Sequence, residues 1–214
     1  QVDEEEIGIG DHMRIIKSET ITETIKELCI KGACHLPTDV YNRLLEAIST
    51  EDSPVSKHTL EILKENADIA ASNQEPICQD TGMACVFVEI GQEVYVDGNL
   101  TEAINEGVRQ GYTEGYLRKS VVDDPVFDRI NTKDNTPAII HYDIVPGDKL
   151  KITVAPKGFG SENMCQVKML KPSDGIEGVK NFILKVVEDA GPNPCPPIVI
   201  GVGIGGTFDY VTYL

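Results

Sequence analysis

The chain has 214 residues, 41% of them apolar, and its 35 acidic residues outnumber its 19 basic ones to give a net charge of −16. No apolar run reaches the ~18 residues that cross a bilayer, so we expect a soluble globular protein of one large or two small domains, with no membrane partner. The negative charge disfavours nucleic acid as a partner, and six cysteines without an N-terminal apolar segment favour a reducing, cytoplasmic compartment over a secreted disulfide framework.

The N-terminal part is predicted to be helical after a short arm. Residues 1–17 combine an acidic run with glycines and show no sustained period, which predicts a mobile arm. Thr20 and Glu23 have the spacing of a capping box, and the apolar residues that follow recur at helical spacing and place Cys29 on a core stripe.

Two further helices are predicted from their start signals. Pro37 begins one of them, and Ser53 with Pro54 supplies the N-cap and first residue of the next, which Pro76 terminates.

Strands are expected next, interrupted by one helix. Residues 83–90 are apolar and β-branched, and Val94 to Val96 could return after Gly91 as the second strand of a hairpin. Asn99 is predicted to cap a helix whose apolar stripe stops just before Arg118.

The C-terminal part adds strands and a helix. Residues 138–145 and 150–155 are strand-like, residues 174–191 are helical, and Pro197 to Val202 is predicted to be a buried strand. The chain then stops at Leu214 soon after a new helix is expected to begin, which suggests a C-terminal truncation. Together these elements predict a mixed α/β (α+β) fold, with an N-terminal helical layer packed on sheet strands and the ligand loops at strand ends.

Three stretches are richer in polar residues or glycine than a core requires. The first, PICQDTG over residues 76–82, presents a thiol, an amide and a carboxylate on Cys78, Gln79 and Asp80 before a strand. From these residues alone, a simple connection with a buried cysteine is about as good an interpretation as a functional loop.

The second stretch, GPNPCPPIVIGVGIGG over residues 191–206, holds Cys195 between prolines that fix the backbone around it. Rigid presentation of one thiol suits a metal or cluster ligand, with a proline-rich loop as the alternative. Gly201, Gly203 and Gly206 also match a dinucleotide-binding fingerprint, but the βαβ unit that this fingerprint needs cannot be checked.

The third stretch, KGFGSENMC over residues 157–165, follows a strand. Its backbone amides could form an anion-binding nest beside Lys157 that would suit a small carboxylate, although glycine-rich surface loops are also common.

These three stretches, together with KMLKPSDG after the third of them, resemble motifs of the iron-dependent (class I) fumarate hydratase and tartrate dehydratase alpha family. Segments of the N-terminal helices, LPTDVYNRLLEA and LEILKENADIA, extend the resemblance over about residues 20–214. It implies that residues 18–214 form a hydro-lyase alpha-type catalytic domain, truncated at its C-terminus, and that residues 1–17 lie outside it.

The family resemblance implies a four-iron four-sulfur cluster with one iron open to substrate. Cys78 and Cys195 match two ligand positions, and the third cysteine ligand is expected beyond Leu214. Cys165 matches no ligand position and is predicted to be an ordinary loop or core cysteine.

The resemblance also assigns substrate and acid-base roles. Gln79, Arg118 and Gly160 match substrate-binding positions, and Asp80 matches the acid-base network. Without the resemblance, Arg118 would be interpreted as a solvated residue near a helix C-terminus.

The implied activity is the reversible hydration of a C4 dicarboxylate, with fumarate to malate favoured over tartrate. The implied partners are a small dicarboxylate, a beta subunit or C-terminal domain, and other copies in a homo-oligomer. Two rival hypotheses are a non-catalytic fragment that only docks a beta subunit and a nucleotide-binding domain built on Gly201 to Gly206.

Overall fold

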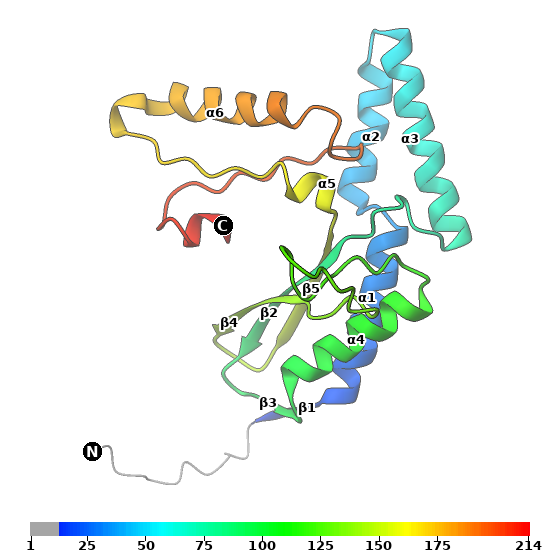
Figure 1. Ribbon diagram of the computed structural model, residues 1–214, viewed down its shortest axis with the longest axis vertical. Coiled ribbons are helices and arrows are strands. Elements are labelled where there is room, and N and C mark those ends of the chain that lie inside the picture. The colour runs from blue at the N-terminus through cyan, green and yellow to red at the C-terminus, as the bar shows by residue number, and fades with distance from the viewer. Residues whose placement is uncertain (1–12) are drawn as a thin grey trace. The chain divides into compact units, whose positions relative to one another are not determined.

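The computed structural model describes residues 13–214, which form two compact units. The first, here called the sheet unit, comprises residues 13–34 and 81–156 of the described chain. The second, called the hairpin unit after its pair of long helices, comprises residues 35–80 and 157–214. Both are drawn in Figure 1.

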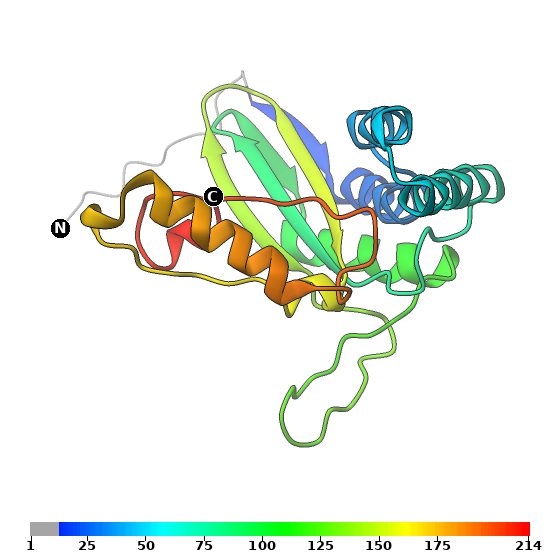
Figure 2. The ribbon, with the colours of Figure 1, turned by 90° about the horizontal axis from the view of Figure 1, so that it is seen from above.

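The sheet unit contains two small sheets and two helices. In Figure 2, β2 lies between β4 and β5, which is the order of the three-stranded sheet, and β1 pairs with β3 in parallel. β2 and β4 are also parallel, with Val86 opposite Ile140. The elements of this unit are β1 (Arg14–Lys17), α1 (Ser18–Cys34), β2 (Met83–Gly91), β3 (Val94–Asp97), α4 (Leu100–Glu114), β4 (Ile139–Val145) and β5 (Leu150–Lys157).

The core of the sheet unit lies between its two helices and one face of the sheet. Alternate residues of β2 are buried, as the two-residue period of a strand requires, and they join the apolar stripes of α1 and α4 in one cluster. The predicted core position of Cys29 is confirmed, since its side chain is fully buried. The helices approach closely at Gly107, where an added Cβ would lie 2.6 Å from the Cβ of Ile25.

The predicted hairpin between residues 83–90 and 94–96 is wrong. β3 pairs with β1 instead, because the chain at Gly91 is held against a different turn. The Gly91 amide donates to the Lys149 carbonyl at 2.8 Å, and a Cβ on Gly91 would lie 2.1 Å from the Gly147 oxygen. That close approach requires glycine and directs the chain away from β2.

The structure covers only the end of the arm predicted over residues 1–17. Residues 1–12 lie outside the described residues, and Arg14–Lys17 forms strand β1 rather than the end of an arm. That residues 18–214 act as one catalytic domain stays a prediction.

The hairpin unit is built from the paired helices α2 and α3, a third long helix, α6, and polar loops. α2 and α3 lie side by side (Figure 1), and the Tyr41 hydroxyl donates to Asp68 at 2.7 Å across them. Ser53 caps α3 as predicted, by accepting from the Ser56 amide. The elements of this unit are α2 (Thr38–Thr50), α3 (Pro54–Asn73), α5 (Phe159–Glu162), η1 (Pro172–Asp174), α6 (Gly175–Ala190) and η2 (Tyr210–Thr212).

The predicted buried strand over Pro197 to Val202 is wrong. This segment has no strand structure, and Val199 is 72% exposed. A strand needs a neighbour to satisfy its backbone hydrogen bonds, and the segment pairs with no strand of the described residues.

The mixed α/β fold class is confirmed, since helices pack on a sheet in which β2 and β4 run parallel and β5 lies on the other side of β2. Of the three N-terminal helices predicted to form a layer on the sheet, α1 contributes to the core cluster and α2 and α3 belong to the hairpin unit. Between residues 13 and 214, no helix is both long and apolar enough to cross a membrane.

Candidate functional site

Residues from all three polar or glycine-rich stretches meet within the hairpin unit. The Sγ atoms of Cys78 and Cys195, which are 117 positions apart in the sequence, lie 3.3 Å from each other. Cys195 is exposed and Cys78 is partly buried, so both thiols are open to small molecules.

The Cys78 loop is fixed by short-range polar contacts. The Asn66 side chain on α3 donates to the Ile77 carbonyl at 2.9 Å and holds the start of the loop. The Asp80 amide donates to the Cys78 sulfur at 3.4 Å, and the Cys78 thiol donates to the Gln79 side-chain oxygen at 3.3 Å. The two residues after Cys78 thus help to orient its sulfur.

The Asp80 carboxylate joins this loop to the stretch after β5. Its Oδ2 accepts hydrogen bonds from the amides of Phe159 at 2.9 Å and Gly160 at 3.4 Å. These are amides of the predicted anion-binding nest, so the nest does bind a carboxylate, and that carboxylate belongs to Asp80. Whether Gly160 also contacts a substrate stays a prediction.

Gly160 is also where the Cys195 loop approaches. A Cβ added to Gly160 would lie 2.6 Å from the carbonyl oxygen of Asn193, two residues before Cys195. Only a residue without a side chain fits there, so Gly160 allows contact between two of the three stretches.

Lys157 lies beside the nest and pairs with a carboxylate there. Its Nζ lies 2.9 Å from a carboxylate oxygen of Glu162 and donates to the Ser161 hydroxyl at 3.0 Å. Cys165 lies at the far end of this turn, exposed, with its sulfur 4.0 Å from the same Nζ.

The environment of Cys195 favours the neutral thiol. The hydrogen bond with Cys78 raises the pKa of the Cys195 thiol, and partial burial raises it further. Burial alone raises the pKa of Cys29, in the sheet unit, to about 12.

Arg118 belongs to the sheet unit, where its backbone is held by Thr81. The buried Thr81 hydroxyl donates to the Arg118 carbonyl at 3.1 Å and accepts from the Arg118 amide at 2.9 Å. The residue that directly follows Asp80 in the sequence therefore fixes the segment that carries Arg118.

Sequence reasoning missed both Thr81 and Asn135. The fully buried Asn135 accepts from the amides of Ser120 and Val121 and donates to the Gly82 carbonyl. Thr81 could have been found from its place inside the PICQDTG motif. Asn135 has no comparable signal, because its partners are 14 or more positions away in the sequence.

The pair of thiols suits iron or another soft metal. Thiolates are the ligands of iron-sulfur clusters, and these two sulfurs converge on polar loops rather than in an apolar core. Residues 13–214 contain no cluster of three or more Cys, His, Asp or Glu side chains that could hold a metal ion. Cys78 and Cys195 therefore fit as part of a ligand set.

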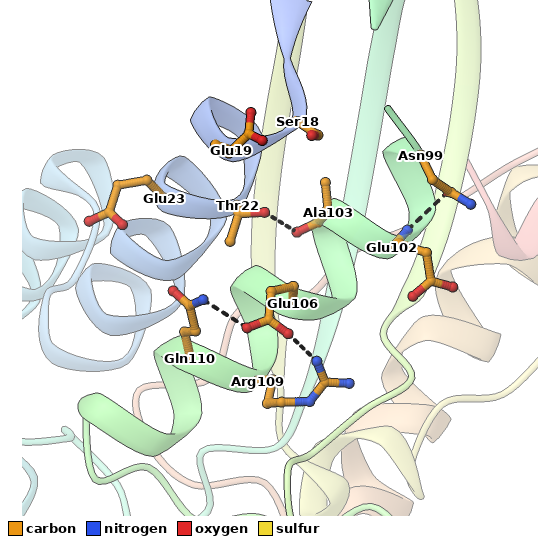
Figure 3. A pocket seen from close by; sticks show the side chains of 10 residues that line it. All are labelled: Ser18, Glu19, Thr22, Glu23, Asn99, Glu102, Ala103, Glu106, Arg109 and Gln110. Carbon is orange, nitrogen blue, oxygen red and sulfur yellow. Dashed lines mark hydrogen bonds and ion pairs between the residues drawn. The ribbon is translucent and has the colours of Figure 1, made fainter. Parts of the chain in front are cut away.

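A groove with polar walls lies elsewhere. Figure 3 shows this groove, of about 580 Å³, in the sheet unit between α1 and α4. Its walls carry four glutamates and Arg109, whose guanidinium pairs with Glu106. It contains none of the predicted site residues, and the sequence motifs point to the loops instead.

Comparison with known proteins agrees with the motifs. The family described as Fumarate hydratase (Fumerase) matches residues 22–214. The chain belongs to this family.

The relatives of this chain include tartrate dehydratase subunits. It is 45% identical over 194 residues to the protein named "Putative L(+)-tartrate dehydratase subunit alpha" of Methanocaldococcus jannaschii, a match that covers 88% of this chain and 68% of that protein. It is 30% identical over 198 residues to the L(+)-tartrate dehydratase subunit alpha of Escherichia coli strain UTI89, covering 91% of this chain and 65% of that protein. The chain thus spans about two thirds of the length of these relatives.

Proposed function

We propose that this chain is the cluster-binding part of a hydro-lyase that adds water to, or removes it from, a C4 dicarboxylate, with fumarate to malate as the favoured reaction. The observation that carries this proposal is the 3.3 Å contact between the sulfurs of Cys78 and Cys195, in a chain of the fumarate hydratase family.

The cofactor of this proposal is a four-iron four-sulfur cluster held by Cys78, Cys195 and a third cysteine expected beyond Leu214. When bound, its open iron supplies a Lewis acid that polarises the hydroxyl to be eliminated.

The protein's own groups would orient the substrate and move its proton. The guanidinium of Arg118 would grip a substrate carboxylate through two parallel hydrogen bonds. The Gln79 amide and the Gly160 backbone would add polar contacts. Thr81 fixes the backbone of Arg118, which supports this orienting role.

Asp80 would serve the acid-base network. Its Oδ2 is fixed by two backbone amides, so the carboxyl group has a defined orientation, as a base that removes a proton next to a carboxylate requires.

Dehydration of L(+)-tartrate is the second candidate, favoured by the names of the relatives. Tartrate carries one hydroxyl more than malate, and a pocket discriminates such a pair only through specific polar contacts. In a tartrate enzyme the same Cys78 and Cys195 would hold the cluster, so the substrate alone separates the two candidates.

A substrate panel tests the proposal. The intact protein that contains this chain, with its partner subunit, is reconstituted anaerobically with iron and sulfide and given fumarate, L-malate and L(+)-tartrate. Turnover is followed by the ultraviolet absorbance of the fumarate double bond and by the keto acid formed from tartrate. Turnover of one substrate that vanishes in Cys78→Ser and persists in Cys165→Ser supports the proposal, whereas full activity of Cys78→Ser would contradict it.

The proposal includes partners and a compartment. We expect a beta subunit as partner, assembly into a homo-oligomer and residence in the cytoplasm, and the relatives' names as alpha subunits support the first of these.

A non-catalytic docking role is the remaining alternative. If the chain binds its partner subunit but no dicarboxylate raises the melting temperature of the reconstituted complex, docking is the better description.

A further inference from the structure

The Cys78 and Cys195 sulfurs lie close enough to consider a bond between them. The two Sγ atoms lie 3.3 Å apart, and the contact joins two loops of the same compact unit. In the proposed cluster each cysteine would bind a different iron, so the two sulfurs would have to lie farther apart than they do here. The observed contact instead brings them close to the distance from which a sulfur–sulfur bond of ~2.05 Å forms.

The two cysteines differ in how their backbones are held. Prolines on both sides stiffen the backbone of Cys195, whereas Cys78 lies on a loop without helix or strand structure. Closing the remaining gap of about 1.2 Å needs adjustment of the two side chains and of the Cys78 loop. Cys195 is exposed, so an oxidant can reach it from solvent.

We propose that Cys78 and Cys195 are a modification site, a thiol pair that a low-molecular-weight disulfide such as oxidised glutathione converts into an intramolecular disulfide in the cluster-free protein. Formation of this disulfide rests on the geometry of the pair alone. Its consequence, that the oxidised pair can no longer hold iron, rests on the proposed function.

The exchange proceeds in two displacements. The Sγ of one cysteine attacks a sulfur of oxidised glutathione, which forms a mixed disulfide and releases one glutathione. The second Sγ attacks the cysteine sulfur of that mixed disulfide, which forms the Cys78–Cys195 bond and releases the second glutathione. Both cysteine protons end on the two glutathione thiols, and the two electrons that the cysteine thiols lose reduce the disulfide of oxidised glutathione.

The other exposed cysteine of the hairpin unit provides a matched control. The Cys165 sulfur contacts the Ser161 carbonyl, a Glu162 carboxylate oxygen and the Lys157 amine. It can start the same exchange, but none of these contacts among the described residues is with a second thiol that could complete it. Cys165 should therefore keep its glutathione, whereas Cys78 and Cys195 should lose theirs.

Peptide mapping tests the proposal. The intact, metal-free and reduced protein is incubated with oxidised glutathione, blocked with an alkylating agent and digested without reduction for mass spectrometry. We expect a cross-linked peptide that joins Cys78 to Cys195, and glutathione on Cys165. In Cys195→Ser, glutathione should stay on Cys78, and Cys165→Ser should still form the cross-link.

Two results would overturn the proposal. One is glutathione on both Cys78 and Cys195 without a cross-link, and the other is both residues unmodified while Cys165 reacts. The same reaction in concentrated urea provides a reference, because an unfolded chain should give mixed pairings among its six cysteines. If urea and native conditions give the same pairings, the folded geometry does not select the pair.

Iron binding separates this proposal from the proposed function. The reduced protein should load iron and sulfide, the oxidised protein should not, and a thiol reductant should restore loading. A cross-link without iron loading of the reduced protein would refute the proposed function alone. Iron loading without a cross-link would refute the disulfide alone.

Discussion

In the sheet unit, Cys29 and Cys34 are fully buried among apolar side chains, whereas in the hairpin unit Cys78 and Cys195 face each other on polar loops. The same residue type acts as a small apolar group in one place and as a pair of potential ligands in the other. The difference comes from the neighbours, since α1 presents Cys29 to a closed core and two loops present Cys78 and Cys195 to solvent.

The two units also differ in the contacts that hold them together. The sheet unit has one apolar cluster shared by two helices and a sheet, and backbones in close contact at Gly107. The loops of the hairpin unit are joined by the Asp80 hydrogen bonds, the sulfur contact and the fit of Gly160. Changes in the sheet unit should therefore alter global stability, and changes in the loops should alter local order and iron binding.

The largest stability effect is expected for Gly107→Ala. The new methyl group would meet Ile25 and the Thr22 carbonyl, both within 2.6 Å, so the helices must separate. Overpacking of this kind costs about 1–3 kcal/mol, and a chain of this size loses about 2–4 °C in melting temperature per kcal/mol. Thermal unfolding of the variant and of the natural chain measures this loss in melting temperature. Gly201→Ala is the control, because its methyl group meets nothing within 4 Å; equal melting temperatures for the two variants would contradict the packing account.

Alkaline pH should weaken the sheet unit through Cys29. Burial raises the pKa of this thiol from 9.0 to about 12, so the unfolded chain releases its proton first. The stabilisation is complete below pH 9 and is lost as the pH rises toward 12, by about 2 kcal/mol between about pH 9 and pH 10.5. Urea unfolding across this range should show a smaller pH slope for Cys29→Ala than for the natural chain. Identical slopes would mean that the thiol is not shielded.

Thr81→Val should destabilise the Arg118 segment. Valine keeps the shape but leaves the Arg118 amide and carbonyl without the hydroxyl that binds both. A lost buried partner costs about 1–3 kcal/mol, and we expect the lower half of that range because both hydrogen bonds are only partly buried. Thr81→Ser keeps the hydroxyl and should retain most of the stability in the same urea titration. Equal loss in both variants would assign the effect to packing.

The smallest global effect is expected for Asp80→Ala. Loss of the Asp80 carboxylate removes the hydrogen-bond acceptor of the Phe159 and Gly160 amides. These two amides should then exchange hydrogen faster, while the amides of α4 keep their protection. Asp80→Asn retains a side-chain oxygen that can accept and should keep most of the local protection. Uniform loss of protection along the whole chain would show that the two units do not respond separately.

Elements that depend on local pattern could be predicted from the sequence. The helical spacing around Cys29 and the caps at Ser53 and Asn99 gave the helices, because these signals lie within a few residues of each other. Pairing of distant strands could not be predicted in the same way. Val94–Asp97 pairs with Arg14–Lys17, far away in the sequence, and the segment after Pro197 finds no partner strand among the described residues.

The candidate site shows the same division. Composition and motif identified the three stretches and Cys78, Asp80 and Cys195 within them. The contacts between them depend on the fold, as does the fact that the Gly160 amide meets the Asp80 carboxylate. Asn135 was missed because it acts through backbone groups that no local motif marks.

The central claim is that Cys78 and Cys195 together hold the cluster. Its most direct test is the iron and acid-labile sulfide content of the anaerobically reconstituted intact protein, measured for Cys78→Ser, Cys195→Ser and Cys165→Ser. We expect loss of iron and sulfide in the first two variants and the natural content of both in the third. Natural iron and sulfide in Cys78→Ser or Cys195→Ser would contradict it.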